Sequence, residues 1–390
     1  MTENPVTKLL GRRLRIAMIG GGPGSFIGGI HRIAARMDDC YELTTGIFSS
    51  RPERSAEIAR DFGIAPDRIY NDVDHLLERE SARDDGIDVV AIMTPNDSHY
   101  SYAMAAVNHG FNVICDKPLT NTLEEARQLH AAVVEAKVVF CLTHNYTGYP
   151  MVRQARALVE SGALGEIRLV QVEYVQGGKA EPIEMDSDAP RSWKFEPARR
   201  GPSAVMGDIG THAHNLVRYI TTLEISAVAA ELGAIVPGRE FDDYAGAFLR
   251  LENGGRGVFW VTQAAAGMDN SLKIRVSGDK GTVEWQQEIP QQLDYRPLHE
   301  PAQRIVPNGP GVLPLSKRVS RIVKGHPEGF PEAFANIYRD AAEAIAARIA
   351  GTTPDPLAMT FPTAADGLKG VEFVAAAIES NTNGGRWIDL

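Results

Sequence analysis

The chain has 390 residues, of which 44% are hydrophobic and 23% charged, as is typical of a globular protein long enough for two domains. Its net charge of -10 argues against a nucleic-acid partner, because binding to a phosphate backbone needs a basic face. No apolar run reaches membrane-spanning length and no signal-peptide pattern opens the chain, so no membrane partner is expected. Cys40, Cys115 and Cys141 lie far apart, which favours free thiols and a cytoplasmic location.

The first third alternates strands and helices. Residues 14–20, LRIAMIG, form an apolar run that ends in glycine, a pattern typical of a buried parallel strand followed by a tight turn. Gly20 and Gly22 then fit a dinucleotide fingerprint, in which bare backbone lets a pyrophosphate approach the next helix. Simple spacing puts Ser25 at the third position, whereas a longer loop would use Gly28. A purely structural turn is the alternative.

A second strand is predicted over residues 41–50, which completes a βαβ unit. NAD-selective sites usually end this strand with an acid, but here it ends in Ser49, Ser50 and Arg51. Hydroxyls and a guanidinium could equally receive a 2′-phosphate, so the choice between NAD and NADP stays open. Alternatively, Arg51 and Pro52 only begin a solvated helix.

Two further predicted strands end in polar clusters. The strand over residues 87–100 ends in Thr94, Pro95 and Asn96, and the strand over residues 111–120 ends in Asp116, Lys117 and Pro118. Because ligands in open α/β sheets bind beyond the carboxyl ends of the strands, both clusters are candidate site segments. Pro118 fixes the backbone after Lys117, which favours a positioned lysine over a solvated one.

From about residue 146 the pattern changes to that of an antiparallel sheet with helices on one side. Val170, Val172 and Tyr174 fall on one face of a half-buried strand, and Asn253-Gly254 and Gly278-Asp279 predict tight turns. The proline-rich stretch from 286 to 330 predicts a long loop that is either functional or disordered. His326 within it is a candidate substrate contact, although a plain segment leading into a helix is favoured.

Residues 207–215, GDIGTHAHN, place Asp208 and His212 four positions apart. On one helix these positions share a face, so the carboxylate can orient the imidazole. Asp208 is expected in the first turn, where the helix dipole favours a carboxylate, and Gly210 is expected to leave room for a ligand. Taken alone, the pattern fits a capping acid and a core histidine better.

Five stretches resemble the Gfo/Idh/MocA oxidoreductases, named for glucose-fructose oxidoreductase, inositol dehydrogenase and a rhizopine-catabolism protein. They are IGGGPGSFIG, TPNDSH, CDKPLT, GDIGTHAHN and FPTAADGLKGVEFVAAAIES, so the likeness covers essentially the whole chain. Asp116 departs from the family's usual Glu, and Asn215 from a common Asp. The resemblance implies an α/β fold with a doubly wound, parallel Rossmann domain (1–145). The remainder (146–390) would be an α+β domain with a largely antiparallel, open-faced sheet for substrate binding and homo-oligomer formation, its last helix free to pack back.

The resemblance also reverses the preference at Asp208 and His212 and implies a catalytic group with Lys117. Oxidation of a secondary alcohol needs a base and a donor to the reacting oxygen, which His212 and Lys117 supply while Asp208 orients the ring or contacts substrate. The roles of Lys117 and His212 can exchange. The implied cofactor contacts for NAD or NADP are Gly20, Gly22, Gly24, Ser25, Phe26, Ile27, Ser49, Ser50, Arg51, Thr94, Pro95, Asn96, His99, Asp116, Lys117 and Asn145. The implied substrate contacts are Lys117, Tyr146, Trp193, Lys194, Arg199, Asp208 and His212.

The first functional hypothesis is therefore a dehydrogenase that acts on a ring hydroxyl, at C3 by closest resemblance, of a sugar, glycoside or inositol. A second is an NAD-dependent glycoside hydrolase that oxidises C3 transiently and recycles its cofactor. A non-catalytic sugar or dinucleotide sensor is the third. If Lys194, Arg199 and Arg200 converge, an anionic sugar becomes the expected substrate. No metal is expected, since the sequence has no zinc-ligand spacing.

Overall fold

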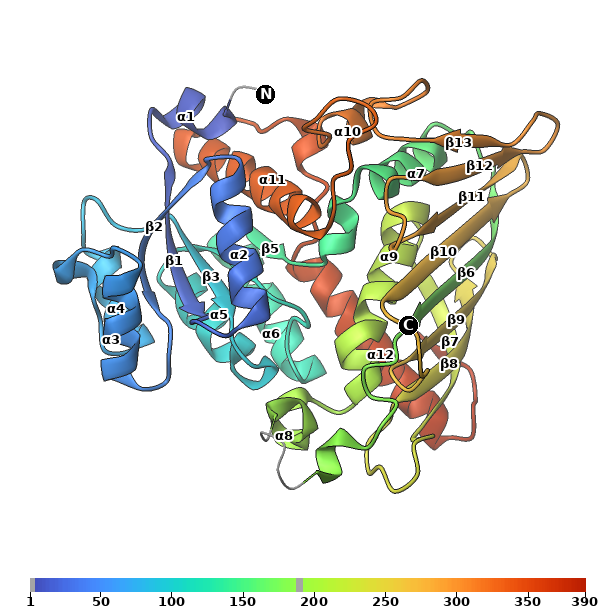
Figure 1. Cartoon of the computed structure of the whole chain (residues 1–390), viewed down its shortest axis with the longest axis horizontal. Helices are drawn as coiled ribbons and strands as arrows, with labels where there is room; N and C mark the ends of the chain where they lie inside the picture. The colour runs from blue at the N-terminus through green and yellow to red at the C-terminus, as the bar shows by residue number, and fades with distance from the viewer. Residues whose placement is uncertain (1–3, 187–191) are drawn as a thin grey trace. The chain divides into compact units, whose positions relative to one another are not determined.

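The computed structural model describes residues 4–186 and 192–390, and it divides into two compact units (Figure 1). The first unit contains Met1–Thr120, Glu124–Gly148 and Phe330–Leu368. The second contains Asn121–Leu123, Tyr149–Gly329 and Lys369–Leu390. The predicted division into 1–145 and 146–390 differs from this, because the chain returns to the first unit after residue 329.

The first unit is built on a five-stranded parallel sheet in the order β2-β1-β3-β4-β5, which confirms the Rossmann-like fold. Its strands are β1 (Leu14–Gly20), β2 (Tyr41–Ile47), β3 (Val89–Met93), β4 (Asn112–Cys115) and β5 (Phe140–Leu142). The first strand coincides with its prediction. The next three are shorter than predicted, because the chain leaves the sheet where the polar clusters begin. Every residue of β3 and β4 is buried, as expected for central strands of a sheet covered on both faces.

Helices complete this unit, and one comes from far along the sequence. They are α1 (Pro5–Leu10), α2 (Phe26–Met37), α3 (Pro52–Asp61), α4 (Val73–Ser81), α5 (His99–Asn108), α6 (Leu123–Ala136) and α11 (Phe330–Ala350). Figure 1 shows α11 beside α2, where His31 stacks edge-on against Phe334 and Tyr338. This buried aromatic contact explains why residues after 329 pack with the first unit.

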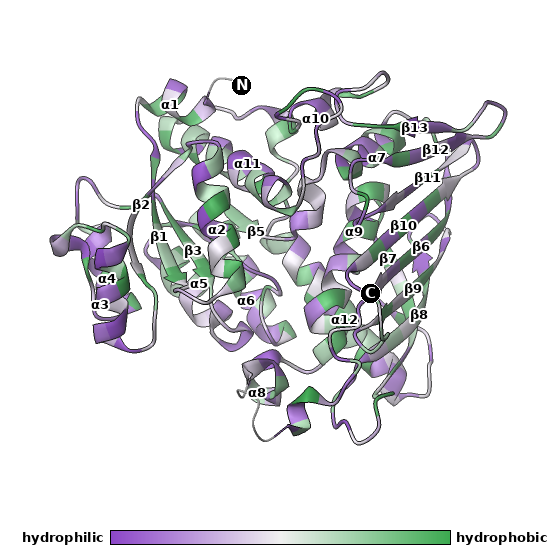
Figure 2. Ribbon diagram, viewed as in Figure 1, coloured by the Kyte–Doolittle hydropathy of each residue, from purple (hydrophilic) through white to green (hydrophobic). Residues whose placement is uncertain are grey.

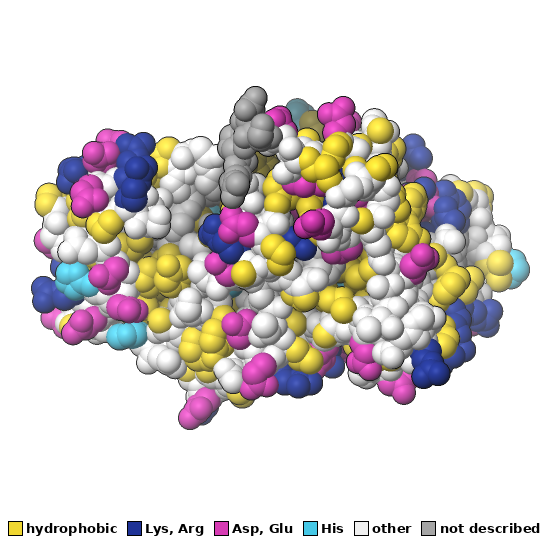
Figure 3. Space-filling model, turned by 90° about the horizontal axis from the view of Figure 1, so that it is seen from below, with side chains coloured by type: hydrophobic (Ala, Val, Ile, Leu, Met, Phe, Trp, Pro, Cys, Tyr) yellow, Lys and Arg dark blue, Asp and Glu magenta, His cyan; other side chains and the backbone are white. Residues whose placement is uncertain are grey.

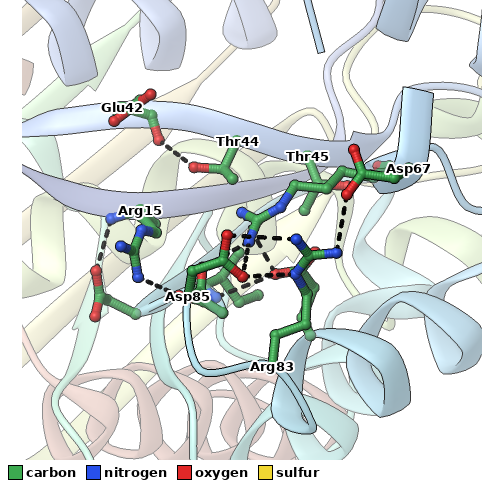
Figure 4. Close-up of polar contacts among 12 residues, drawn as sticks. Arg15, Glu42, Thr44, Thr45, Asp67, Arg83 and Asp85 are labelled. Atoms are coloured by element: carbon green, nitrogen blue, oxygen red, sulfur yellow. Dashed lines mark hydrogen bonds and ion pairs between the residues drawn. The ribbon is translucent and has the colours of Figure 1, made fainter. Parts of the chain in front are cut away.

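A charged cluster joins the loops around α4 and the start of β3 in the first unit (Figure 4). Arg68 is buried and contacts Glu80 at 3.7 Å and Asp85 at 2.8 Å. Arg83 binds Asp85 and Asp67 at 2.7 and 3.1 Å, and the Arg83 hydrogen bond lowers the pKa of Asp85 to about 2. These bonds hold together the segments that lead into β3.

The second unit is built on a nine-stranded sheet in the order β13-β12-β11-β10-β6-β9-β8-β7-β14. Its strands are β6 (Ile167–Val175), β7 (Ile225–Gly233), β8 (Tyr244–Leu251), β9 (Arg256–Thr262), β10 (Ser271–Gly278), β11 (Gly281–Gln286), β12 (Leu293–Pro297), β13 (Gln303–Ile305) and β14 (Ile388–Asp389). Neighbouring strands are antiparallel except for β6 and β9. Val170, Val172 and Tyr174 are buried together as predicted, and Figure 2 shows hydrophobic and hydrophilic residues alternating along the central strands.

The stretch from 286 to 330 is more ordered than the long loop that was predicted. It contributes β12 and β13 to the sheet, with Leu293 opposite Trp285 in register, and then forms α10 (Pro314–Lys317). Gln154 fixes it to α7 (Pro150–Glu160) by donating to Gly311 O at 3.0 Å and accepting from Leu313 N at 2.8 Å. Short strands inside a proline-rich sequence have too weak a local pattern to be recognised without their partner strand.

The remaining helices of the second unit are α8 (Pro197–Arg200), α9 (Thr211–Thr221) and the C-terminal part of α12 (Ala364–Thr382). Helix α9 packs against β6 and β10. Across residues 4–186 and 192–390, no helix is both long and apolar enough to cross a membrane. Charged side chains of both signs are interspersed with hydrophobic ones on the face shown in Figure 3.

Candidate active site

Glycines in the loop between β1 and α2 and at the start of α2 allow stretches of backbone to pack directly against one another. A Cβ on Gly28 would lie 2.3 Å from the Cα of Gly21, and a Cβ on Gly22 would lie 2.4 Å from the carbonyl oxygen of Phe48. Ser25 caps α2 by accepting a hydrogen bond from Gly28 N at 3.1 Å. Gly28 and Ser25, the two candidates for the third fingerprint position, therefore have different structural roles. Gly28 makes the close approach between turn and helix, whereas Ser25 is the N-cap.

The other loop residues predicted for the cofactor surround this turn. Gly24 has a φ of +91° and open space at its Cβ position, and Phe26 is 74% exposed. After β2, Arg51 is exposed and its backbone N–H donates to Ser49 Oγ at 3.2 Å. Arg51 is the N-cap residue of α3, and Pro52 begins that helix. This agrees with the alternative prediction that these two residues begin a helix.

The turns after β3 and β4 are joined by a buried histidine. The Nδ1 atom of His99 lies 2.7 Å from Pro118 O, and its Nε2 atom lies 3.0 Å from Thr94 O. Asp116 accepts hydrogen bonds from Lys117 N at 3.0 Å and from Thr143 Oγ1 at 2.8 Å. The backbone on both sides of Lys117 is therefore fixed, by Asp116 before it and by His99 through Pro118 after it.

Asn145 and Tyr146 lie in the short turn after β5, and both are buried. Among the residues that the structure describes, the buried Nδ2 group of Asn145 has no hydrogen-bond partner. A buried amide donor without a partner is costly, so a ligand acceptor at this position would be stabilising. The ring of Tyr146 lies edge-on to Phe330 at 6.5 Å, and its predicted substrate contact stays a prediction.

The prediction that Asp208 and His212 lie on one regular helix is wrong. Asp208 lies in a π-helical turn, Met206–Gly210, whereas His212 lies in the first turn of α9. Short π-helical insertions occur often at functional sites. The Cβ position of Gly210 faces the Met206 sulfur at 2.9 Å and the Phe259 ring at 3.5 Å. The expectation that Gly210 leaves room for a ligand is therefore wrong, since this glycine instead permits close core packing.

A hydrogen-bonded network holds Asp208, and sequence reasoning missed most of its members. Asp208 Oδ2 accepts from Gln263 Nε2 at 3.0 Å and lies 3.8 Å from Lys194 Nζ. Gln263 also donates to Gln176 Oε1 at 3.1 Å and accepts from the buried Lys179 Nζ at 2.6 Å. Burial lowers the pKa of Lys179, and the charge of Asp208 partly offsets this effect. The sequence signal that could have identified the missed residues is their position, since Gln176 and Lys179 follow β6 and Gln263 follows β9.

The same network continues towards His212. Gln176 Nε2 donates to Asn270 Oδ1 at 2.6 Å, and Tyr174 Oη donates to the same oxygen at 2.8 Å. The ring of Tyr174 lies edge-on to that of His212, with 6.4 Å between centroids. His212 itself is 8% exposed. The second unit therefore brings together one carboxylate, one imidazole, two lysine side chains and several neutral hydrogen-bonding groups.

The cations expected near this site have different partners. Lys194 pairs with Asp208, whereas Arg199 lies 4.0 Å from its neighbour Glu196. Arg200 donates to Phe195 O at 3.1 Å and stacks over the ring of Phe241. The expectation of an anionic substrate, which depends on three converging cations, stays a prediction. Trp193 begins a short 3-10 turn, and His326 is exposed with Nδ1 3.2 Å from Val323 O.

Within residues 4–186 and 192–390, no group of three or more His, Cys, Asp or Glu side chains could hold a metal ion. A parallel sheet with a glycine turn at a helix N-terminus, followed by a sheet domain with an acid–histidine pair, defines the class of dinucleotide-dependent oxidoreductases. Residues 14–146 match the family described as "Oxidoreductase family, NAD-binding Rossmann fold", and residues 152–284 match the "GFO/IDH/MocA C-terminal domain". The chain belongs to the GFO/IDH/MocA family, and it is an NAD(P)-dependent oxidoreductase.

Several relatives resemble the chain over most of its length. An oxidoreductase from Sinorhizobium meliloti is 44% identical, with a TM-score of 0.87, and the match covers 97% of this chain and 99% of that one. An inositol dehydrogenase homolog from Azotobacter vinelandii, complexed with NADH and myo-inositol, is 34% identical with a TM-score of 0.89 and both chains fully covered. A levoglucosan dehydrogenase from Pseudarthrobacter phenanthrenivorans is 30% identical, covering 75% of this chain and 78% of the relative.

Proposed function

We propose that this protein oxidises a secondary ring hydroxyl of a neutral sugar, glycoside or inositol. One relative is named for levoglucosan and the solved structure of another contains myo-inositol, and both of these compounds are neutral. The observation that most supports the proposal is the hydrogen-bonded network around Asp208, next to His212. It offers a carboxylate, amides and two lysine side chains, and groups of these kinds form hydrogen bonds with the hydroxyls of a polyol. By the family resemblance, C3 is the proposed carbon.

The first unit has the features that a dinucleotide requires. The turn from Gly20 to Gly28 brings glycine backbone close to the start of α2, so that a pyrophosphate could approach the helix N-terminus. Asn145 offers a buried amide donor with no partner among the described residues. We propose that these groups, with the residues around Ser49, Thr94, Pro95 and Asn96, bind NAD or NADP. The bound cofactor supplies the hydride acceptor.

We propose that His212 and Lys117 act on the same substrate hydroxyl. His212 takes the hydroxyl proton, a role that histidine side chains often have in general acid–base catalysis. Lys117 donates a hydrogen bond to the reacting oxygen, and the bonds of Asp116 and His99 hold its backbone in place. Asp208 keeps the substrate or the imidazole oriented. Trp193, Lys194, Arg199 and Tyr146 are proposed substrate contacts.

A cofactor-reduction assay tests this proposal. The purified protein is incubated with NAD and, separately, with NADP against a panel of neutral and anionic sugars, glycosides and inositols, while cofactor absorbance and released aglycone are followed together. Oxidation of a neutral polyol with net formation of reduced cofactor is expected. Release of aglycone without reduced cofactor would instead favour redox-neutral hydrolysis, and no turnover with any compound would favour a sensor.

Variants then test the residue roles. His212→Asn should lower kcat/KM by about a hundredfold to ten-thousandfold, the usual contribution of a general base. His109→Asn, a change of an exposed histidine on the first unit, is the matched control and should leave the rate unchanged. Full activity of the His212 variant would contradict the assignment.

We also propose that two copies of the chain associate through the outward face of the sheet. Leu169, Phe248, Val258 and Trp260 are exposed on neighbouring strands, and Phe248 lies directly opposite Val258. Exposed large apolar side chains on neighbouring strands are common at interfaces. Light scattering after size exclusion should show a dimer or larger oligomer, and Phe248→Glu should shift it to the monomer. A monomeric wild-type protein would contradict this proposal.

A cytoplasmic location is proposed from the three cysteines, which are all free and buried. Secreted proteins more often pair their cysteines in disulfides. Fractionation of cells that express the chain tests this location.

A further inference from the structure

Lys179 is a buried lysine in the second unit whose main partner is an uncharged amide. It follows β6, is 9% exposed, and its Nζ atom donates to Gln263 Oε1 at 2.6 Å. The ammonium also lies about 6 Å from the ring centroids of Phe195 and Phe241, which stack on each other. A buried charge is costly unless its interactions compensate for lost hydration, so this lysine calls for an explanation.

The contact with Lys179 determines which way the Gln263 amide faces. An ammonium can only donate, so the amide oxygen faces Lys179 and the amide nitrogen faces Asp208 and Gln176. The backbone holds this pair together, because Lys179 N donates to Gln263 O at 2.9 Å. If the amide turned over, its oxygen would face the Asp208 carboxylate and repel it.

Arg239 fixes the segment that carries Lys179. Its guanidinium donates to Lys179 O at 2.7 Å and to Glu181 O at 2.9 Å, and it binds Glu184 and Asp243 at 2.6 and 2.9 Å. The side chain of Arg239 is fully buried. Lys179 therefore lies on a rigid support rather than on a flexible loop.

We propose that Lys179 is a positioning residue, which orients Gln263 so that its amide holds the Asp208 carboxylate beside His212. This inference rests on the proposed function, because it assumes that Asp208 and His212 serve catalysis. Lys179 acts on Asp208 mainly through its hydrogen bond to Gln263. Loss of its charge should therefore affect turnover without altering cofactor binding in the first unit.

Four variants test the role of Lys179. Lys179→Met keeps the aliphatic stem against the two phenylalanine rings, and we expect kcat to fall tenfold to a hundredfold with the cofactor KM unchanged within twofold. Lys179→Arg retains a cationic donor and should recover part of this loss. Gln263→Leu should lower kcat as well, and the double variant Lys179→Met/Gln263→Leu should be no slower than the slower single variant, because both act through one contact.

Arg218→Met is the matched structural control. Arg218 lies on α9, the helix that carries His212, and pairs with Glu224 at 2.6 Å. This variant removes a partly buried cation from the same helix and should keep the wild-type kcat. Unchanged kcat in Lys179→Met, additive losses in the double variant, or an equal loss in Arg218→Met would overturn the proposal.

A second measurement does not depend on turnover. Carbodiimide labelling of carboxyl groups, read by mass spectrometry, should modify Asp208 several times faster in Lys179→Met than in the wild type, with no change in Arg218→Met. Equal labelling of Asp208 in the wild type and Lys179→Met would overturn the inference. A wild-type protein that oxidised no polyol would defeat the proposed function alone, while the labelling result would still decide on Lys179.

Discussion

Replacing His31 on α2 should remove a pH-dependent part of the stability of the first unit. His31 is fully buried, its ring stacks against Phe334, and its Nδ1 atom lies 2.6 Å from Tyr338 Oη. Burial lowers its pKa from 6.5 to about 4, an effect that the charge of Asp116 only partly offsets. His31 therefore stays neutral in the folded protein at pH values where it is charged in the unfolded chain.

The direction and size of the effect follow from proton linkage. Between pH 6.5 and about 4 the unfolded chain binds a proton at His31 that the folded chain does not, so stability is highest above this range and falls as the pH decreases through it. The two pKa values give a loss of about 2 kcal/mol between neutral pH and about pH 5. Below the folded-state pKa this group causes no further loss.

Urea unfolding at these two pH values measures the effect. His31→Asn can keep a hydrogen bond to Tyr338, whereas His31→Phe keeps the aromatic packing, so the two variants lose different amounts of stability at neutral pH. In both variants, the free energy of unfolding should nevertheless change between the two pH values by about 2 kcal/mol less than in the wild type. All four tryptophans belong to the second unit, so tryptophan fluorescence reports that unit alone, whereas circular dichroism reports the two units together. The first unit is followed through the difference between the two signals. Equal pH dependence in the wild type and both variants would refute the reasoning.

Two further predictions concern packing, one in each unit. Gly28→Ala would place a Cβ 2.3 Å from the Gly21 backbone and should lower both cofactor affinity and the melting temperature, whereas Gly29→Ala, which meets open space on the same helix, should be neutral or stabilising by up to about 1 kcal/mol. Equal cofactor affinity for both, measured by titration, would show that the close approach does not matter. Arg239→Met leaves Asp243 buried without its cation and should destabilise the second unit by about 3–5 kcal/mol in tryptophan-monitored unfolding. A loss below about 1 kcal/mol would contradict the importance given to this pair.

Much of the fold could be predicted from the sequence, because short-range patterns encode it. The apolar run before Gly20 marks β1, and the turn at Asn253-Gly254 joins β8 and β9 as predicted. The stretches around Lys117 and around Asp208 and His212 were singled out through their resemblance to the family, and the catalytic roles of these residues stay predictions. Residues within a few positions of one another determine all of these features.

Only the tertiary structure decided which distant residues meet. Residues 330–368 pack with the first unit because the aromatic side chains of α11 are buried against His31, and no local pattern specifies that contact. Gly28 makes the close approach because of where Gly21 lies, and Gln263 binds Asp208 across 55 positions of sequence. Local spacing determines secondary structure and the types of reactive groups. The partners of a buried charge depend instead on how strands far apart in the chain pair in one sheet.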